Sequence, residues 1–224
     1  THHTGRWPHE GVDFTGKRVG VIGTGSSAIQ SIPLIAEQAA HLFVFQRTPN
    51  YSIPAHNAPL DPERVREIKS DYAGFRSRNA QMPFGANFPP SDRSALQVGE
   101  DERRREYESR WRQGGLGFIT SFADLGSDRA ANETAGAFLR EKIRSIVRDP
   151  AVAEKLSPTQ VVGCKRLCVD TNYYATFNRP NVTLVDARTA KRLPRASKRE
   201  VADLVLDRVV ALRSQRINAG ARPA

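Results

Sequence analysis

The stretch VGVI (Val19–Ile22) leads directly into GTGSSA (Gly23–Ala28), and these residues decide the fold. A short apolar run that ends in a glycine-rich turn and continues as a helix is typical of a nucleotide-binding α/β unit. Backbone N–H groups and the positive end of the helix dipole then converge on one point, which suits a pyrophosphate. Gly23 permits the tight turn, Gly25 lets phosphates approach, and Ala28 is the small residue needed where helix meets strand. We assign the phosphate site to Gly23, Thr24, Gly25, Ser26, Ser27 and Ala28.

The residues on both sides of this turn predict a βαβ unit. Residues 17–22 form a compact β-rich run, and residues 26–40 repeat apolar side chains at helical spacing. Residues 42–45 form a second apolar strand. Pro33 lies inside the predicted helix, where its missing N–H is expected to produce a kink. We therefore expect an α/β fold with a Rossmann-like nucleotide-binding domain.

The residues after the second strand indicate which dinucleotide is bound. An NAD-binding protein places Asp or Glu there to hold the ribose 2′-hydroxyl, whereas this chain has Gln46-Arg47-Thr48. A cation favours a 2′-phosphate, so the sequence predicts NADP(H), with Arg47 as its contact and Thr48 and Gln30 as further cofactor-binding residues. The alternative at this point is a glycine turn in an α/β protein with an incidental surface arginine.

The composition is that of a folded protein without a membrane segment. The chain has 224 residues, enough for one large or two small domains, and 39% of them are hydrophobic. No apolar run approaches the ~20 residues that cross a bilayer, and residues 1–8 contain no apolar core of a signal peptide. Cys164 and Cys168 lack zinc-site spacing and are interpreted as small buried thiols, and the histidines show no metal spacing. We expect a cytoplasmic protein without a metal site.

The net charge of +10 is compatible with nucleic-acid binding, but its position along the chain argues against that function. Residues 187–224 contain ten Lys or Arg and three Asp or Glu, so +7 of the charge belongs to this tail. No aromatic residue lies among these cations, so base stacking is missing, although electrostatic attraction to phosphate would persist. We therefore expect no nucleic-acid partner.

Pattern and composition divide the chain into five segments. Helical spacing and charge predict helices over residues 61–78, 99–113 and 130–148, and a β-rich run at 181–186 returns the chain to the sheet. The expected segments are an entry linker (1–12), the βαβ unit (13–60), a helical insertion (61–156), a return to the cofactor region (157–186) and a basic, atypical and irregular tail (187–224).

Several further motifs occur in order along the chain. HTGRWP (His3–Pro8) is similar to the second half of a known fingerprint, FxGxxxHxxxWP, and the glycine turn follows it at the same spacing. FQRTP (Phe45–Pro49) and GCKRL (Gly163–Leu167) come next, followed by the segment 173–186. A Trp-Pro or Lys-Arg pair alone would mean little. In this order, over residues 1 to about 186, the chain resembles the flavin-dependent Baeyer–Villiger monooxygenases.

The resemblance implies an oxidoreductase that uses two nucleotide cofactors. In this family NADPH reduces a tightly bound FAD, the reduced flavin takes up O2, and one oxygen atom is inserted beside a ketone carbonyl to give an ester or lactone. The implied cofactors are NADP(H) and FAD. The implied partners are a ketone substrate and O2, with no nucleic acid and no membrane.

The resemblance also implies roles for four residues. Arg166 would be the catalytic arginine that stabilises negative charge on oxygen, a task that suits a permanently charged guanidinium. Lys165 would point the other way in an extended segment and contact the NADP 2′-phosphate beside Arg47. His3 and Trp7 would belong to an inter-domain linker that couples cofactor movement to catalysis. Without the resemblance, an adjacent Lys and Arg would be interpreted as solvated surface charges.

The sequence departs from the family pattern at both ends. The family places its FAD-binding glycine motif well before the fingerprint, whereas this chain begins inside the fingerprint, so the FAD site is expected largely outside it. After Asp186 the family continues with a hairpin and an apolar strand, whereas this chain becomes Arg-rich. We expect a fragment of a larger gene, with a shifted reading frame as one source of the tail, that is catalytically incomplete alone. The alternatives are a related flavin-containing or N-hydroxylating monooxygenase, and a non-catalytic NADP-binding or basic interaction module.

Overall fold

The described region comprises residues 1–82, 85–86 and 88–186 of a computed structural model. The basic tail predicted over residues 187–224 lies outside the described residues. In the described region, no helix combines the length and the apolar character needed to cross a membrane.

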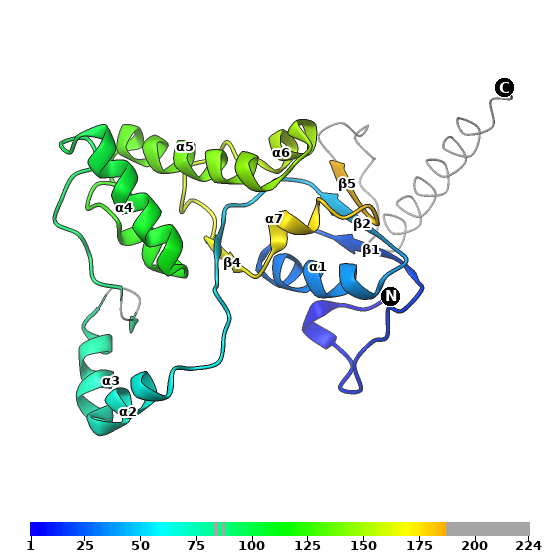
Figure 1. The fold of residues 1–224 in the computed structure, drawn as a ribbon, viewed down its shortest axis with the longest axis horizontal. Coiled ribbons are helices and arrows are strands. Elements are labelled where there is room, and N and C mark those ends of the chain that lie inside the picture. The colour runs from blue at the N-terminus through cyan, green and yellow to red at the C-terminus, as the bar shows by residue number, and fades with distance from the viewer. Residues whose placement is uncertain (83–84, 87, 187–224) are drawn as a thin grey trace, which may run out of the picture. The chain divides into compact units, whose positions relative to one another are not determined.

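Three parallel strands form the main sheet, in the order β1-β2-β5 (Figure 1). β1 (Arg18–Ile22) pairs with β2 (His41–Gln46), and β2 also pairs with β5 (Val182–Asp186). The helix α1 (Ser26–Gln38) connects β1 to β2 and packs against both. Parallel strands with β2 in the middle and a helical crossover after β1 form a Rossmann-like arrangement. The predicted α/β class is confirmed.

The helix α1 ends two residues before its predicted end and runs through Pro33 as one element. Pro33 removes one backbone hydrogen bond from the helix interior. The same stretch buries Ile29 and Ile32 completely. Full burial of a side chain of this size is worth about 1.5–3 kcal/mol, so two of them offset the loss of about 3 kcal/mol at a helical proline.

The middle of the chain is helical, as the sequence predicts, with one difference. The run expected to form one helix over 61–78 forms two, α2 (Pro62–Ser70) and α3 (Tyr72–Ala80). Asp71 leaves the helical conformation between them, and its carboxylate accepts the N–H of Gly74 at 3.0 Å as the N-cap of α3. The other helices are α4 (Glu100–Gln113), α5 (Arg129–Ile146), α6 (Pro150–Leu156) and the short α7 (Tyr173–Thr176).

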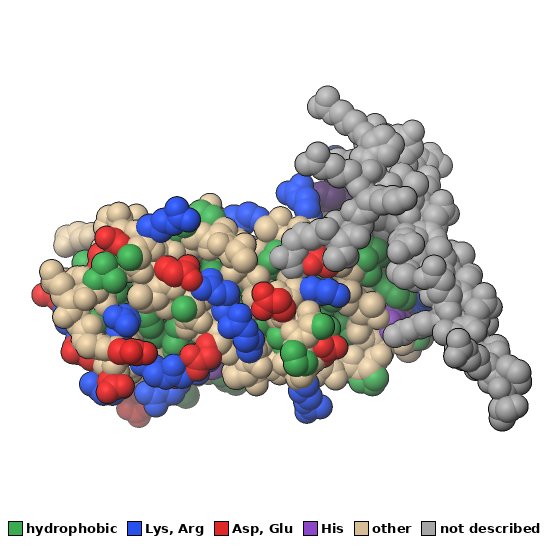
Figure 2. Space-filling model, turned by 90° about the horizontal axis from the view of Figure 1, so that it is seen from above, with side chains coloured by type: hydrophobic (Ala, Val, Ile, Leu, Met, Phe, Trp, Pro, Cys, Tyr) green, Lys and Arg blue, Asp and Glu red, His purple; other side chains and the backbone are tan. Residues whose placement is uncertain are grey.

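Ion pairs join α4 to α5 at the surface. Arg104 pairs with Glu141 at 2.5 Å, and Lys142 pairs with Glu108 at 2.7 Å. Figure 2 shows Lys and Arg side chains interspersed with Asp and Glu on one face of the molecule. The Arg104–Glu141 pair is exposed and contributes at most about 1 kcal/mol, whereas the Lys142–Glu108 pair is half-buried.

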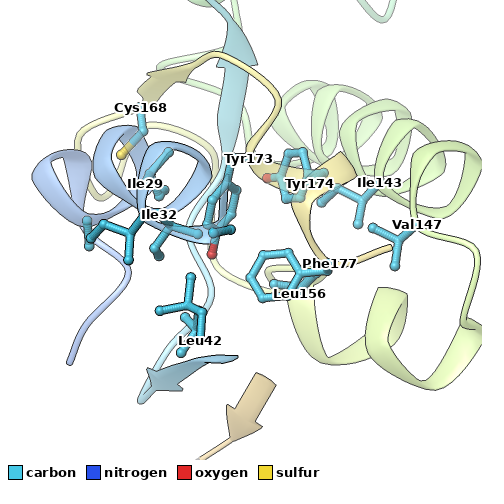
Figure 3. Close-up of a cluster of buried hydrophobic side chains, with 14 of the residues drawn as sticks. Ile29, Ile32, Leu42, Ile143, Val147, Leu156, Cys168, Tyr173, Tyr174 and Phe177 are labelled. Atoms are coloured by element: carbon cyan, nitrogen blue, oxygen red, sulfur yellow. The ribbon is translucent and has the colours of Figure 1, made fainter. Parts of the chain in front are cut away.

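Two clusters of buried side chains hold the described region together. The first packs α1 and β2 against α5, α6 and α7, and Figure 3 labels ten of its residues. In the second, Tyr107 of α4 lies against Phe118 and Phe138, with ring centroids 5.4 and 5.3 Å away. The helix α5 contributes Ile143 to the first cluster and Leu139 to the second. This helix therefore connects the middle of the chain to the βαβ unit.

A second pair of parallel strands was not predicted. β3 (Ser52–Pro54) pairs with β4 (Cys168–Asp170). Each strand has only three residues, too few for a recognisable alternation of apolar and polar side chains. β3 follows the segment that carries Arg47, and β4 follows the segment that carries Lys165 and Arg166. The pairing therefore connects two segments of the predicted site.

Candidate cofactor-binding site

The glycine turn joins the carboxyl end of β1 to the start of α1. Gly23 has a φ of +103°, in the left-handed region that favours glycine. Its N–H donates to the Phe45 carbonyl of β2 at 2.9 Å. The turn is therefore held by a backbone conformation suited to glycine and by a hydrogen bond to the neighbouring strand.

Gly25 is the N-cap of α1 and needs a different explanation. Its φ of −87° is open to any residue, and a Cβ added there would meet no atom within 4 Å. Nothing in the described region therefore requires a glycine at this position. A phosphate that approaches the backbone closely does require one, so the open space at Gly25 fits the predicted pyrophosphate.

The start of α1 offers backbone donors to an anion. No side chain caps the helix at Gly25. The N–H groups of Ser26, Ser27 and Ala28 have no hydrogen-bond partner within the described ranges. The first N–H groups of any helix lack an intrahelical acceptor, and together with the helix dipole they attract phosphate. These donors and the space at Gly25 form one cradle.

The pairing of β1 with β2 brings Arg47 next to this cradle. Ile22 and Phe45 are partners in the sheet, so Arg47 leaves the sheet at the edge where the glycine turn begins. The hydroxyl of Thr24 donates to the Thr48 carbonyl at 3.0 Å and ties the two segments together. The side chain of Arg47 is exposed, and no carboxylate of the described region pairs with it. Its charge is available to an anion.

A turn over residues 161–164 precedes Lys165 and Arg166, and neither of these residues belongs to a strand. Gly163 has a φ of +91°, and the N–H of Cys164 donates to the Val161 carbonyl at 3.2 Å, which closes the turn. β4 begins only at Cys168. The opposite orientation of the Lys165 and Arg166 side chains, expected if this segment is extended, stays a prediction. Both side chains are exposed.

Two contacts place β4 beside the start of α1. The hydroxyl of Ser26 and the thiol of Cys168 are 3.3 Å apart. The side-chain amide of Gln30 donates to the Val169 carbonyl at 3.3 Å. Arg166 lies two residues before Cys168, so the segment of Lys165 and Arg166 ends next to this contact. The side chains of Ser26 and Gln30, both predicted to bind cofactor, therefore also connect α1 to β4.

The two linker residues lie away from the cradle. His3 accepts the N–H of Gly5 at 3.1 Å, and the ring of Trp7 lies 6.1 Å from the ring of Phe14. The N–H of Phe14 donates to the side chain of Gln38, the last residue of α1. A helix of this length spans about 20 Å. Trp7 is thus connected to the end of α1 opposite the glycine turn.

The sequence did not indicate a role for Asn50, and it predicted the wrong surroundings for one of the two cysteines. The amide of Asn50 donates to the Cys168 thiol at 3.2 Å. Cys168 is 1% exposed and burial raises the pKa of its thiol, whereas Cys164 is exposed. The interpretation of both cysteines as buried is therefore wrong for Cys164, because the turn before β4 points the two residues into different surroundings. The signal for Asn50 was its place in the loop after β2.

A buried carboxyl group supports the small sheet from within. Asp170 accepts the Ser52 hydroxyl at 2.5 Å and the N–H of Tyr173 at 2.8 Å. Burial raises the pKa of Asp170, although these two hydrogen bonds act in the opposite direction. Asp170 joins β3, β4 and α7 and is a structural group. Within the described ranges, no three His, Cys, Asp or Glu side chains are placed to hold a metal ion.

Comparison with known proteins identifies relatives of this chain, although no family model matches it. A cyclohexanone 1,2-monooxygenase of an Acinetobacter species is 44% identical over 192 residues, which cover 84% of this chain and 34% of the relative. A Baeyer-Villiger monooxygenase of Pseudooceanicola batsensis is 42% identical over 83% of this chain and 34% of its own length. The chain is homologous to a part of the Baeyer–Villiger monooxygenases.

A further relative has a different substrate. A phenazine N-monooxygenase of Lysobacter antibioticus is 41% identical over 82% of this chain and 34% of its own length. The chain thus spans about a third of the length of the curated relatives it matches.

Solved structures give the same assignment. A steroid monooxygenase solved with NADP is 58% identical and superimposes with a TM-score of 0.78, over 82% of this chain and 35% of that chain. A second structure, solved with FAD and NADP, is 42% identical with a TM-score of 0.79. The described fold is therefore that of one region of the Baeyer–Villiger monooxygenases.

Proposed function

We propose that this chain is the NADP(H)-binding portion of an FAD- and NADPH-dependent Baeyer–Villiger monooxygenase that converts a ketone and O2 into an ester or lactone. The observation that carries the proposal is the cradle at the start of α1. It combines the left-handed Gly23, the open space at Gly25 and the exposed cation of Arg47 at the end of the adjacent strand. The relatives that bind NADP share this region of the chain.

The cradle residues would divide the cofactor between them. The backbone N–H groups of residues 26–28 would hold the pyrophosphate, and Arg47 and Lys165 would hold the 2′-phosphate by charge-assisted hydrogen bonds. Thr24 and Thr48 would act through their mutual hydrogen bond, which keeps the turn next to Arg47. Gln30 would act through its bond to the Val169 carbonyl.

Arg166 would serve the oxygen chemistry. Bound flavin would supply that chemistry, with FAD held largely by sequence outside this chain. The guanidinium of Arg166 is exposed, and no carboxylate of residues 1–186 that the structure describes is paired with it. It would present a permanent positive charge and a planar set of donors to a developing oxyanion. His3 and Trp7 would couple cofactor movement to this step from the far end of α1.

We extend the proposal to organisation and location. Residues 13–60 and 157–186 would form the cofactor region, residues 1–12 the linker, and residues 61–156 an insertion with its own buried cluster. The two free cysteines fit a reducing, cytoplasmic compartment.

The test is a calorimetric titration of the purified chain with NADP+ and with NAD+. We expect NADP+ to bind more tightly. Arg47→Ala should weaken NADP+ binding about tenfold or more, as expected for loss of hydrogen bonds to a charged group, and leave NAD+ binding unchanged. Arg105→Ala is the matched control, because Arg105 is an exposed arginine of α4. Equal effects of Arg47→Ala on both dinucleotides would contradict the cofactor assignment.

A parallel absorbance measurement addresses the flavin. A flavin band that copurifies with the chain, or appears on adding FAD, would mean that this chain binds both cofactors. Stabilisation by NADP+ without any flavin band is the result we expect for an NADP-binding portion.

A second candidate function is N-oxygenation. The similarity to a phenazine N-monooxygenase, at 41% identity, favours it specifically. A full-length protein that contains this region would distinguish the two by its product from a cyclic ketone and from a heteroaromatic amine.

A further inference from the structure

We infer that Cys168 is a positioning residue, whose thiol holds three segments of the cofactor site in place relative to one another. These segments are the glycine turn, the loop after β2 and the segment of Lys165 and Arg166 that leads into β4. The inference rests on the proposed function for its meaning, because it concerns the same cradle. It adds a residue to which neither the motifs nor the resemblance assigns a role.

The thiol touches one group from each segment. Its sulfur lies 3.3 Å from the hydroxyl of Ser26, 3.2 Å from the amide nitrogen of Asn50 and 3.6 Å from the carbonyl oxygen of Arg166. Cys168 is 1% exposed, and Figure 3 shows its side chain beside α1 at the end of the first cluster. The three segments are distant in sequence but meet at one atom.

The protons at this sulfur can be placed without conflict. The amide nitrogen of Asn50 carries only donors, so it donates to the sulfur. The thiol donates its single proton to the Arg166 carbonyl. With the protons in this arrangement, the hydroxyl of Ser26 donates to the sulfur as well. The hydroxyl of Ser26 therefore bonds to Cys168, and its backbone N–H would still be available to the phosphates.

Neighbouring bonds make the thiol the centre of a rigid junction. The N–H of Cys168 donates to the Tyr51 carbonyl at 3.1 Å, and the hydroxyl of Tyr174 donates to the Asn50 carbonyl at 3.2 Å. Removing the sulfur would leave the Asn50 amide, the Ser26 hydroxyl and the Arg166 carbonyl each without this partner. Polar groups left unpaired in a partly buried place are costly, so the segments would separate to reach water.

The first test compares dinucleotide binding by three variants of the full chain. Cys168→Ala should raise the Kd for NADP+ and for NAD+ by the same factor, on the order of fivefold, because it disturbs the pyrophosphate cradle that both ligands use. Cys168→Ser should bind both dinucleotides with a Kd within about twofold of the wild-type value, since a hydroxyl can also accept and donate hydrogen bonds. The exposed Cys164→Ala should bind as wild type does. Unchanged binding by Cys168→Ala, or equal loss in the Ala and Ser variants, would overturn the inference.

The second test needs no cofactor and separates failure of the inference from failure of the proposed function. Hydrogen exchange measured by mass spectrometry should show faster exchange in Cys168→Ala, but not in Cys168→Ser, for peptides covering residues 23–31 and 164–170 together. Peptides from α5 should not change. Faster exchange in only one segment, or throughout the chain, would overturn the inference. If the wild-type chain binds neither dinucleotide, the proposed function fails and the exchange result alone decides the role of Cys168.

Discussion

The glycine turn and the turn before β4 both border the start of α1, but different interactions hold them there. The glycine turn is fixed by its backbone, through the conformation of Gly23, its hydrogen bond to Phe45 and the pairing of β1 with β2. The turn before β4 is attached to α1 by side chains, those of Cys168 and Gln30.

Because of this difference, side-chain substitutions should affect the positions of the two segments unequally. Backbone hydrogen bonds and strand register persist when a neighbouring side chain is replaced, whereas a side-chain contact is lost with its residue. We therefore expect substitutions in the glycine turn to act on the ligand directly. Substitutions around β4 should act by moving one segment against another.

The largest expected effect comes from filling the cradle. Gly25→Asp should weaken binding of both NADP+ and NAD+ on the order of 100-fold, about 2.7 kcal/mol, because a carboxylate would occupy the space of the phosphates and repel them. The fold should persist, since Asp is a favoured N-cap and its Cβ would meet no atom within 4 Å.

Gly99→Asp is the matched control for this substitution. Gly99 is also an N-cap, that of α4, and also has open space around its Cβ position. Both Asp variants should unfold at or above the Tm of wild type, and only Gly25→Asp should lose the dinucleotide in a calorimetric titration. Retention of binding within threefold by Gly25→Asp would show that the cradle is not a phosphate site.

The next largest effect is expected at Lys165, and it shows whether the segment before β4 binds the same ligand as the glycine turn. Lys165→Ala should raise the Kd for NADP+ about fivefold and leave that for NAD+ unchanged, because its ammonium is exposed and contributes less than the Arg47 guanidinium. Lys69→Ala, an exposed lysine in the last turn of α2, is the control for general charge. A loss for both dinucleotides would place Lys165 near the pyrophosphate instead.

A smaller effect tests the bond between the glycine turn and the Arg47 segment. Thr24→Val removes the hydroxyl that donates to Thr48 and should cost about 1 kcal/mol of stability and a few-fold in NADP+ affinity. Thr120→Val removes a hydroxyl that donates to the Gly117 carbonyl at the same 3.0 Å, but in the helical insertion. It should lower the free energy of unfolding in urea by a similar amount with no change in affinity. Equal affinity losses would rule out a local link.

The smallest effect concerns the buried carboxyl group of the β4 side. The pKa of Asp170 is raised above its ordinary value of 3.8, so the stability it contributes is present below that value and is lost as pH rises through the folded-state pKa. Asp170→Asn keeps an acceptor for Tyr173 and a donor for Ser52 but does not ionise. We expect it to gain stability relative to wild type, by a few tenths to about 1 kcal/mol, as pH rises from 3.5 to 7. Unfolding in urea across this range measures the difference, and a constant difference would contradict the expectation.

The parts of the fold that could be predicted are those with a local cause. The order of β1, α1 and β2 follows from apolar runs and a glycine turn, and α4 and α5 follow from charge and helical spacing close to their observed bounds. The break at Asp71 was missed, because its cap on Gly74 competes with a helical pattern that continues on both sides. The pair β3 and β4 was missed because strands of three residues carry no period.

The same division applies to the candidate site. The sequence singles out Gly23, Gly25 and Arg47 because a phosphate turn needs those residue types at that spacing. Asn50 and the role of Cys168 could not be found, because their contact joins positions 118 residues apart. The assigned roles of Arg47, Lys165 and Arg166 stay predictions until the variants are measured.

The sequence alone determined the α/β class, the turn and helix that begin the βαβ unit, and the cation at the end of the second strand, because each depends on neighbouring residues and on backbone conformation. The tertiary structure decided which surroundings Cys164 and Cys168 have, and that the segment leading from Lys165 and Arg166 into β4 meets the start of α1. Those outcomes depend on contacts between segments far apart in the chain, and no local pattern encodes which distant side chains will meet when the core closes.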